Sequence, residues 1–328
     1  MRSDTDTHPL SRALKNLGIG VAVLILPLGL ASPAVANPSG HDQPAASVQA
    51  ETTTWNVLVG SESQDQTIQG MAYLPKDIYV DAGDTVNWVA NSAEPHTVTL
   101  LAPGQSLPMF NPADPAQLFQ VGGDVYDGHS YYNSGVMSNV LDSGFPAVTN
   151  YALTFPTTGD FTYYCLVHGM MQQGTVHVAG ANDPYPFTQA QYDRQAAVET
   201  HATVLDGNRL RAEANRTSDN HTVIEGADDG TAMVMQFLRP VVSIHVGETV
   251  TFVNNGMAAP HTVTFGEEPQ NPFAPVGDPT NFSGGQLSSG ILEPGSTFTV
   301  TFNSVGTFDY ICALHDFMGM VGKVIVTP

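Results

Sequence analysis

The chain has 328 residues, of which 42% are hydrophobic, so it is long enough to bury the cores of two ordinary domains. Lys and Arg number 10 against 31 Asp and Glu, which gives a formal net charge of -21. This acidic excess excludes nucleic acid as an expected partner.

The first segment has the pattern of an export signal. Basic residues Arg2, Arg12 and Lys15 precede an apolar run over residues 17–30, and the small residues at 34 and 36 form a cleavage pattern. We therefore expect residues 1–36 to be removed on export to the periplasm or the extracellular space. The alternative is an uncleaved N-terminal anchor, although 14 apolar residues are few for a bilayer span. The mature chain is expected to be soluble, because no later stretch has transmembrane length.

Residues 52–180 are expected to form a β-domain. Tyr151, Leu153 and Phe155 alternate with other residues, which is the period of a strand with one buried face. Clusters of Gly and Pro separate such runs, and short alternating strands with these turns indicate an antiparallel sandwich or barrel.

This domain contains a long insertion. Between His96 and Cys165 lie 68 residues, against 50 between His261 and Cys312 further along. The insertion is rich in Gly, Pro, Asn and Tyr, so we expect a surface loop that either contacts partners or covers one end of the sandwich.

A linker is expected over residues 181–218. Within it, residues 188–216 carry Gln, Ala, Arg and Glu without strand alternation, and Thr188 is a suitable N-cap. The linker is therefore predicted to be partly helical.

Residues 219–328 repeat the first domain. The stretch 151–171 matches 298–318 at a constant offset of 147, and both copies contain Gly-x-Phe-x-Tyr-x-Cys-x-x-His-x-x-Met. The upstream halves match as well, including a Pro-His-Thr-Val-Thr segment at 95–99 and again at 260–264. The chain is thus one domain, duplicated.

Each copy holds a candidate metal site made of one His at the end of a strand and a Cys-x-x-His far downstream. A thiolate, two imidazoles and a weak axial group form the trigonal geometry of an electron-transfer copper site. Because the same set occurs twice in matching order, two buried structural Cys or one disulfide are poorer explanations. The six candidate ligands are His96, Cys165, His168, His261, Cys312 and His315.

Both copies resemble cupredoxins, and the second is similar to plastocyanin and pseudoazurin. The residues that carry this resemblance are the 254–256 Asn-Asn-Gly segment, Pro260-His261, and the run from Gly306 through Cys312 to Val324. The resemblance implies two tandem Greek-key β-sandwich domains, all-β apart from the linker. It also implies one type 1 copper ion in each and the transfer of single electrons between redox proteins.

The axial ligands follow from loop spacing within this resemblance. In the second copy the plastocyanin-like spacing selects Met320, and the shorter amicyanin-like spacing selects Met318. The loop of the first copy is one residue shorter: counting from His168 selects Met171, which we expect, whereas counting back from Gly174 selects Gln172.

One departure concerns the residue after the first His. Thr97 and Thr262 stand where plastocyanins usually carry Asn, a residue that ties down the Cys loop. Hydrogen bonding around the sulfur, and with it the redox potential, is therefore not transferable from the family.

Enzymatic chemistry lacks support in the sequence. Oxidases and nitrite reductases built on this fold need further His ligands, as His-x-His pairs or next to the copper-binding Cys, and neither pattern occurs. The other His residues of the mature chain are expected to be surface or turn residues: His41, His129, His177, His201, His221 and His245. The alternatives are an enzyme with an extra copper at an oligomer interface, or a copper storage or delivery protein.

The acidic charge suggests the type of partner. We expect a redox protein with a basic docking face, such as a cytochrome or a reductase, which could belong to a membrane complex. Alternatively, the charge serves only solubility.

Overall fold

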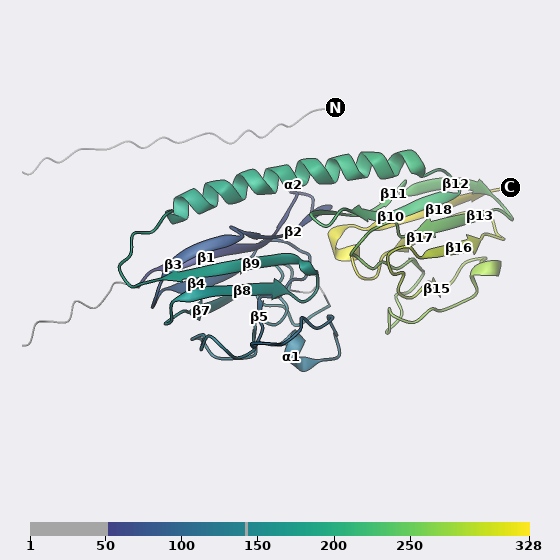
Figure 1. Ribbon diagram of the computed structural model, residues 1–328. Coiled ribbons are helices and arrows are strands. Elements are labelled where there is room, and N and C mark those ends of the chain that lie inside the picture. Colours follow the sequence, from purple (N-terminus) through teal and green to yellow (C-terminus); the bar gives the residue numbers. More distant parts are fainter. Residues whose placement is uncertain (1–51, 142–143) are drawn as a thin grey trace, which may run out of the picture. The chain divides into compact units, whose positions relative to one another are not determined.

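The computed structural model describes residues 52–141 and 144–328 (Figure 1). The expected export signal lies outside these ranges. Within them, no helix combines the length and apolar character needed to cross a membrane.

The first domain is a sandwich of two sheets around one core. One sheet has the order β2-β1-β4-β7 and the other β3-β9-β8-β5-β6. Trp88 of the first sheet and Tyr163 of the second are both fully buried, with ring centroids 5.1 Å apart. The elements are β1 (Thr54–Glu62), β2 (Ile68–Leu74), β3 (Asp77–Asp81), β4 (Thr85–Ala90), β5 (Thr99–Leu100), α1 (Pro115–Leu118), β6 (Tyr132–Asn133), β7 (Asn150–Thr154), β8 (Gly159–Cys165) and β9 (Gly169–Ala179).

The second domain repeats this arrangement. Its sheets have the orders β16-β13-β10-β11 and β12-β18-β17-β14-β15, and Phe252 and Tyr310 take the places of Trp88 and Tyr163 in the core. The elements are β10 (Thr222–Asp228), β11 (Ala232–Leu238), β12 (Val241–His245), β13 (Thr249–Val253), β14 (Thr264–Phe265), η1 (Pro279–Asn281), β15 (Leu287–Ser288), β16 (Thr297–Thr301), β17 (Gly306–Ile311), η2 (Asp316–Met318) and β18 (Val321–Thr327).

The sheets are mixed, which corrects the expectation of a purely antiparallel sandwich. β1 pairs with β4 in parallel and β3 with β9 in parallel, and the second domain repeats both pairs as β10 with β13 and β12 with β18. The chain passes through the opposite sheet between β2 and β4, so β4 can return alongside β1 in the same direction.

A single sheet joins the two domains. β2 pairs with β11 antiparallel, with Gly70 opposite Ala232 and Ile68 opposite Val234, so that eight strands form one continuous sheet. Beside this junction lies a buried apolar cluster from both domains, which we call the junction cluster: Met71, Ala93, Met233, Met235, Ala259 and Met318.

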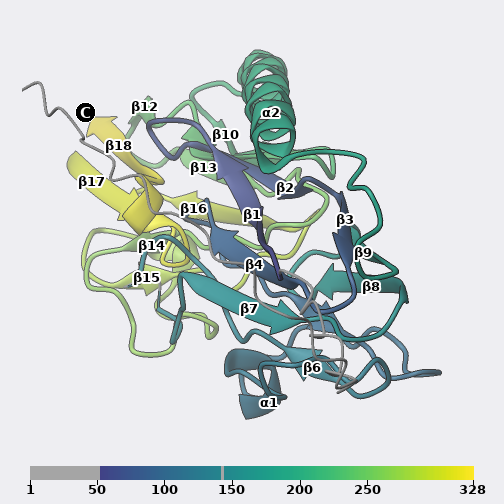
Figure 2. The same cartoon turned by 90° about the vertical axis from the view of Figure 1, so that its left-hand side faces the viewer.

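The linker is partly helical, as expected. It forms α2 (Gln189–Thr217) with Thr188 as N-cap, and the Gln191 side chain accepts a hydrogen bond from the Thr188 backbone N–H. One stripe of the helix contacts β1, β2, β10 and β11 (Figure 2). At Gly207 the helix approaches so closely that a Cβ would lie 2.4 Å from Ile68 Cγ2. The helix therefore spans both domains on one face of the shared sheet.

Candidate metal centres

In the first domain, three side chains from distant parts of the chain meet in the interior. Cys165 ends β8, His168 follows in the tight loop before β9, and His96 precedes β5. Cys165 Sγ lies 3.4 Å from His168 Nδ1 and 4.0 Å from His96 Nδ1. All three side chains are buried, and backbone hydrogen bonds in both directions between His96 and Met137 anchor the distant His to the insertion.

The second domain has the same arrangement. Cys312 follows β17, His315 begins the next loop, and His261 precedes β14. Cys312 Sγ lies 3.4 Å from His315 Nδ1 and 3.8 Å from His261 Nδ1, and the two Nδ1 atoms are 3.1 Å apart. Within the described ranges, these two triads are the only groups of three or more His, Cys, Asp or Glu side chains whose ligand atoms converge.

The triads fit a metal ion in both size and charge. A d-block ion bonded to sulfur at about 2.3 Å and to imidazole nitrogen at about 2.0 Å, at tetrahedral angles, places those atoms about 3.5 Å apart. Burial by itself raises the pKa of Cys165, but His168 and His96 outweigh this effect and lower the pKa to about 5. The pKa of Cys312 is likewise well below its usual value despite burial. Both Cys therefore favour the thiolate, the form that binds metals.

Gln172 is the side chain that lies beside the two His of the first domain. Its Oε1 lies 2.8 Å from His96 Nδ1 and 2.9 Å from His168 Nδ1, and its Nε2 donates to the Ala72 carbonyl. Met171, which we expected here, does not lie at the site: its side chain is 42% exposed and its sulfur approaches Gly230 of the second domain. The physical reason is strand alternation, because successive side chains of β9 point to opposite faces.

In the second domain, Met320 and Met318 lie in different surroundings. Met320 is fully buried in the same core cluster as Cys312, and its carbonyl accepts the Cys312 backbone N–H. Met318 belongs to the junction cluster instead. The plastocyanin-like spacing therefore selects the Met that lies within the site's own domain core.

Thr97 and Thr262 tie down the Cys loops. The Thr97 backbone N–H points at Cys165 Sγ, 3.4 Å away, and its hydroxyl accepts the Leu166 N–H at 2.8 Å. Thr262 makes the same two contacts with Cys312 Sγ and the Ala313 N–H, at 3.3 and 2.7 Å. A Thr hydroxyl thus fills the role for which the family resemblance implied an Asn.

Two glycines lie directly against the rings of the distant His residues, and neither was singled out from the sequence. Gly60 and Gly226 lie at the β-bulges of β1 and β10, with φ of 75° and 69°. A Cβ there would lie 2.5 Å from His96 Nε2 and 2.6 Å from His261 Nε2. The signal that could have found them is their equivalent position in the repeat.

His168 and His315 follow the Cys of their domains in the loop, and we call them the loop His. Their Nε2 atoms, on the side of the ring away from the sulfur, face each other across the domain junction. Between them lies the carboxylate of Glu94, with Oε1 3.6 Å from His168 Nε2 and Oε2 3.9 Å from His315 Nε2. Glu94 is 5% exposed, and its backbone N–H donates to Gln69 Oε1. Burial raises the pKa of Glu94, but His168, His315 and His96 outweigh this and hold it below its usual value.

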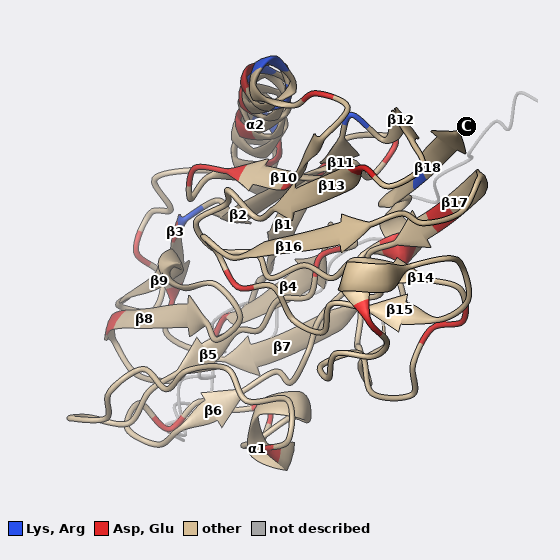
Figure 3. Ribbon diagram, turned by 90° about the vertical axis from the view of Figure 1, so that its right-hand side faces the viewer, with Lys and Arg blue, Asp and Glu red and all other residues tan. Residues whose placement is uncertain are grey.

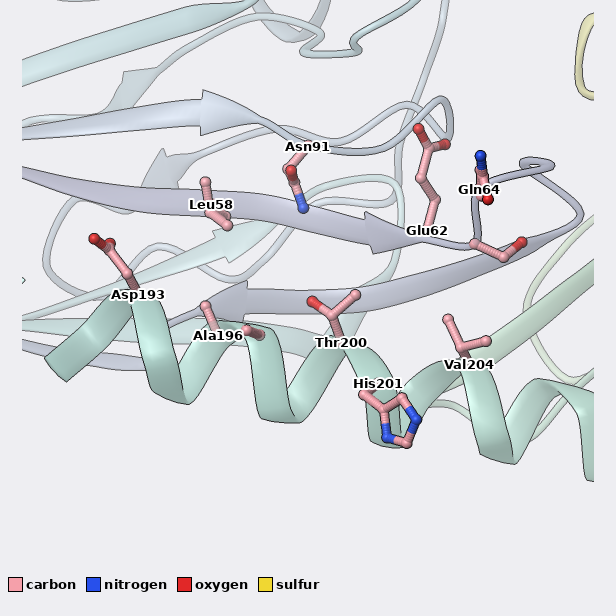
Figure 4. A pocket seen from close by; sticks show the side chains of 11 residues that line it. Leu58, Glu62, Gln64, Asn91, Asp193, Ala196, Thr200, His201 and Val204 are labelled. Atoms are coloured by element: carbon pink, nitrogen blue, oxygen red, sulfur yellow. The ribbon is translucent and has the colours of Figure 1, made fainter. Parts of the chain in front are cut away.

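A surface groove elsewhere contains none of the site residues. It has a volume of about 590 Å³ and lies between β1 and α2, where Leu58 faces Ala196 and Thr200 (Figure 4). His201 points away from the strands in this view. The groove therefore takes no part in the metal centres.

Comparison with known proteins finds plastocyanins among the relatives of this chain. Plastocyanin B'/B'' of Nicotiana tabacum is 38% identical over 104 residues, which are 32% of this chain and 97% of that protein. Plastocyanin of Chlamydomonas reinhardtii is 36% identical over 105 residues, 32% of this chain and 66% of the relative. Among solved structures, the purple cupredoxin of Nitrosopumilus maritimus is 23% identical, with a TM-score of 0.23 over 32% of this chain and 98% of that chain.

The family model of copper binding proteins of the plastocyanin/azurin type matches this chain twice. The matched residues are 60–179 and 221–327, one region on each side of α2, and each contains one Cys-His-His triad. The chain belongs to the plastocyanin/azurin family of copper binding proteins.

Proposed function

We propose that each domain binds one type 1 copper ion and that the chain carries single electrons between redox proteins. The observation that carries this proposal is the buried Cys-His-His triad, which occurs twice with Sγ–Nδ1 distances of 3.4 to 4.0 Å. Copper bound at such a triad supplies a one-electron couple. The proposed ligands are His96, Cys165, His168 and Gln172 in the first domain, and His261, Cys312, His315 and Met320 in the second.

The protein residues hold each site in one geometry. The hydroxyls of Thr97 and Thr262 hold the Cys loops by accepting backbone N–H groups of these loops, and the bulge glycines leave room for the distant imidazoles. Rigid packing around the ligands keeps the donor atoms in place in both oxidation states, which favours fast electron exchange.

The two sites should differ in potential. The amide oxygen of Gln172 is a harder donor than the thioether of Met320, and hard donors favour Cu(II) whereas soft ones favour Cu(I). We therefore propose that the first site has the lower potential and that an electron moves downhill from the first domain to the second.

Copper analysis with visible spectroscopy tests this function. We expect two copper ions per chain, both with the strong thiolate-to-copper absorption of a blue or purple site. Cys165→Ser and Cys312→Ser should each remove one ion and one band. A wild-type chain with fewer than two such ions contradicts the proposal, and more than two would favour the enzyme alternative.

The partner is proposed to be a redox protein with a basic docking face. Asp and Glu are spread over many strands and loops, whereas most Lys and Arg of the described residues lie on α2 (Figure 3). Charges of opposite sign speed encounter, and salt screens them beyond about 10 Å at 0.1 M. Electron transfer with a basic cytochrome should therefore slow as salt rises; a rate insensitive to salt would remove this part of the proposal.

Export is also proposed, on the sequence of residues 1–36 alone. Mass spectrometry of protein purified from cells should give a chain that begins near Asn37. A chain that keeps its first residues and partitions with membranes would favour the anchor instead.

A further inference from the structure

We propose that Glu94 is the bridge between the two copper sites, so that the chain works as an internal two-centre relay rather than as two independent carriers. This inference rests on the proposed function, because it requires copper at both triads. The observation behind it is a single buried carboxylate within 4 Å of the outer nitrogens of both loop His, one from each domain.

The two loop imidazoles point in corresponding directions. In both triads Nδ1 faces the sulfur, which leaves Nε2 as the atom that leads out of each site. Neither Nε2 leads to solvent, because His168 and His315 are each only 5% exposed. Each site therefore opens toward the other domain.

Glu94 lies where its carboxylate reaches both sites. It lies two residues before His96, on the loop that carries the distant ligand of the first site, and reaches across the junction to the loop His of the second. At 3.6 and 3.9 Å, the two carboxylate oxygens lie close to the outer nitrogens of the imidazoles, and Oε2 has no hydrogen-bond partner among the residues that the structure describes. A buried charge without other partners is costly, so its contacts with the two copper-ligating imidazoles are its main compensation.

The repeat supplies an internal comparison. Glu94 comes directly before the Pro-His pair of the first domain, and Ala259 comes directly before the Pro-His pair of the second. Ala259 packs into the junction cluster. The carboxylate thus occurs once, at the junction of two otherwise matching halves. A symmetric pair of bridging carboxylates would place two like charges together, which is unfavourable in a buried region.

The electron balance of the relay is simple. An external one-electron donor reduces the first site, one electron then leaves that site and enters the second, and an external acceptor oxidises the second. No bond forms or breaks in the internal step. No proton has to move, because both imidazoles keep their Nε2–H directed at Glu94.

Redox titration of Glu94→Gln tests the bridge. A negative charge near a site favours its oxidised form, so removal of the charge should raise the midpoint potential of both sites. We expect about 59 mV at each site, which is a tenfold change in the equilibrium constant for one electron. The matched control is Glu62→Gln, which removes a neighbouring carboxylate that binds the Ala93 N–H and the Asn139 amide but neither His. The control should shift both midpoints less.

Flash reduction of the first site then measures the internal step. In wild type, equilibration between the sites should be independent of protein concentration. In Glu94→Ala it should slow by about tenfold, or about 1.4 kcal/mol at the barrier. Because both midpoints shift together, a slower rate reports weaker coupling rather than a smaller driving force.

The variants also have a structural readout. In the reduced, diamagnetic protein the Nε2–H protons of His168 and His315 should both be protected from exchange with water, and both should lose protection in Glu94→Ala. The bridge is overturned if Glu94→Gln and Glu94→Ala have the same potentials and rates as Glu62→Gln. It is also overturned if the midpoint shifts at one site only. Both results would leave two blue coppers per chain. If the wild-type protein does not bind those two coppers, the proposed function itself is overturned. A third metal ion between the sites overturns the relay.

Discussion

The buried carboxyl of Glu225 makes folding of the second domain dependent on pH. Glu225 lies on β10 and is 0% exposed, and neither carboxyl oxygen has a hydrogen-bond partner in the described part of the chain. Burial, and after it the nearby Cys312, raise its pKa well above the usual value. The equivalent residue of β1 is Val59, since both lie directly before the bulge glycine and pair with an aromatic residue.

Replacement Glu225→Val should therefore stabilise the copper-free protein increasingly as pH rises. The folded protein keeps a proton on Glu225 that the unfolded chain releases above its ordinary pKa of 4.5. The folded form then binds more protons than the unfolded form, so wild-type stability falls with pH by about 1.4 kcal/mol per unit from this residue alone. Between pH 5.5 and 7 the variant should gain stability relative to wild type, by at most about 2 kcal/mol.

Urea unfolding of the copper-free proteins at a series of pH values measures this gain. The exposed Glu293→Gln serves as the control and should keep the wild-type pH dependence. If wild type and Glu225→Val lose stability in parallel over this range, Glu225 is ionised in the folded protein and the reasoning is wrong.

Four further outcomes are expected. Gln172→Met should raise the midpoint of the first site and Met320→Gln should lower that of the second in a stepwise redox titration; unchanged midpoints would show that these side chains do not ligate. Gly226→Ala should disturb the second site's absorption band and cost about 1–3 kcal/mol in urea unfolding, because its φ is 69° and its Cβ meets His261. Thr262→Val should cost about 1–3 kcal/mol by leaving the Ala313 N–H unpaired, and wild-type stability in the same assay would contradict that hydrogen bond. The protein with free copper at a thousand times the dissociation constant should be more stable than the copper-free protein by about 4 kcal/mol or more. An unchanged thermal midpoint on removal of copper would argue against binding to the folded state.

The sequence was most informative where the repeat placed the same residue types twice. The two triads converge in space because Cys-x-x-His spans one strand end and a tight loop, which leaves few possible geometries. The helix after Thr188 was indicated by its composition, although its length was not. Local patterns of this kind depend on neighbours in the chain, so a single sequence carries them.

The sequence was least informative where side-chain direction or the meeting of domains decides. Spacing could not show that Met171 points outward and Gln172 inward, because a loop one residue shorter shifts the alternation of β9. The contact of Glu94 with His315 was invisible, since it depends on the pairing of β2 with β11 rather than on any motif. The parallel strand pairs were missed because alternation reports burial and not strand direction.

The β2–β11 junction places two matching halves edge to edge, as in a homodimer whose subunits have been joined by α2 into one polypeptide. In a true homodimer every substitution occurs in both copies, so the two metal centres must remain identical and no direction of flow between them can be encoded. Fusion removes that restriction. One half can carry Gln172 and Glu94 while the other carries Met320 and Ala259, and a symmetric interface thereby acquires a donor side and an acceptor side.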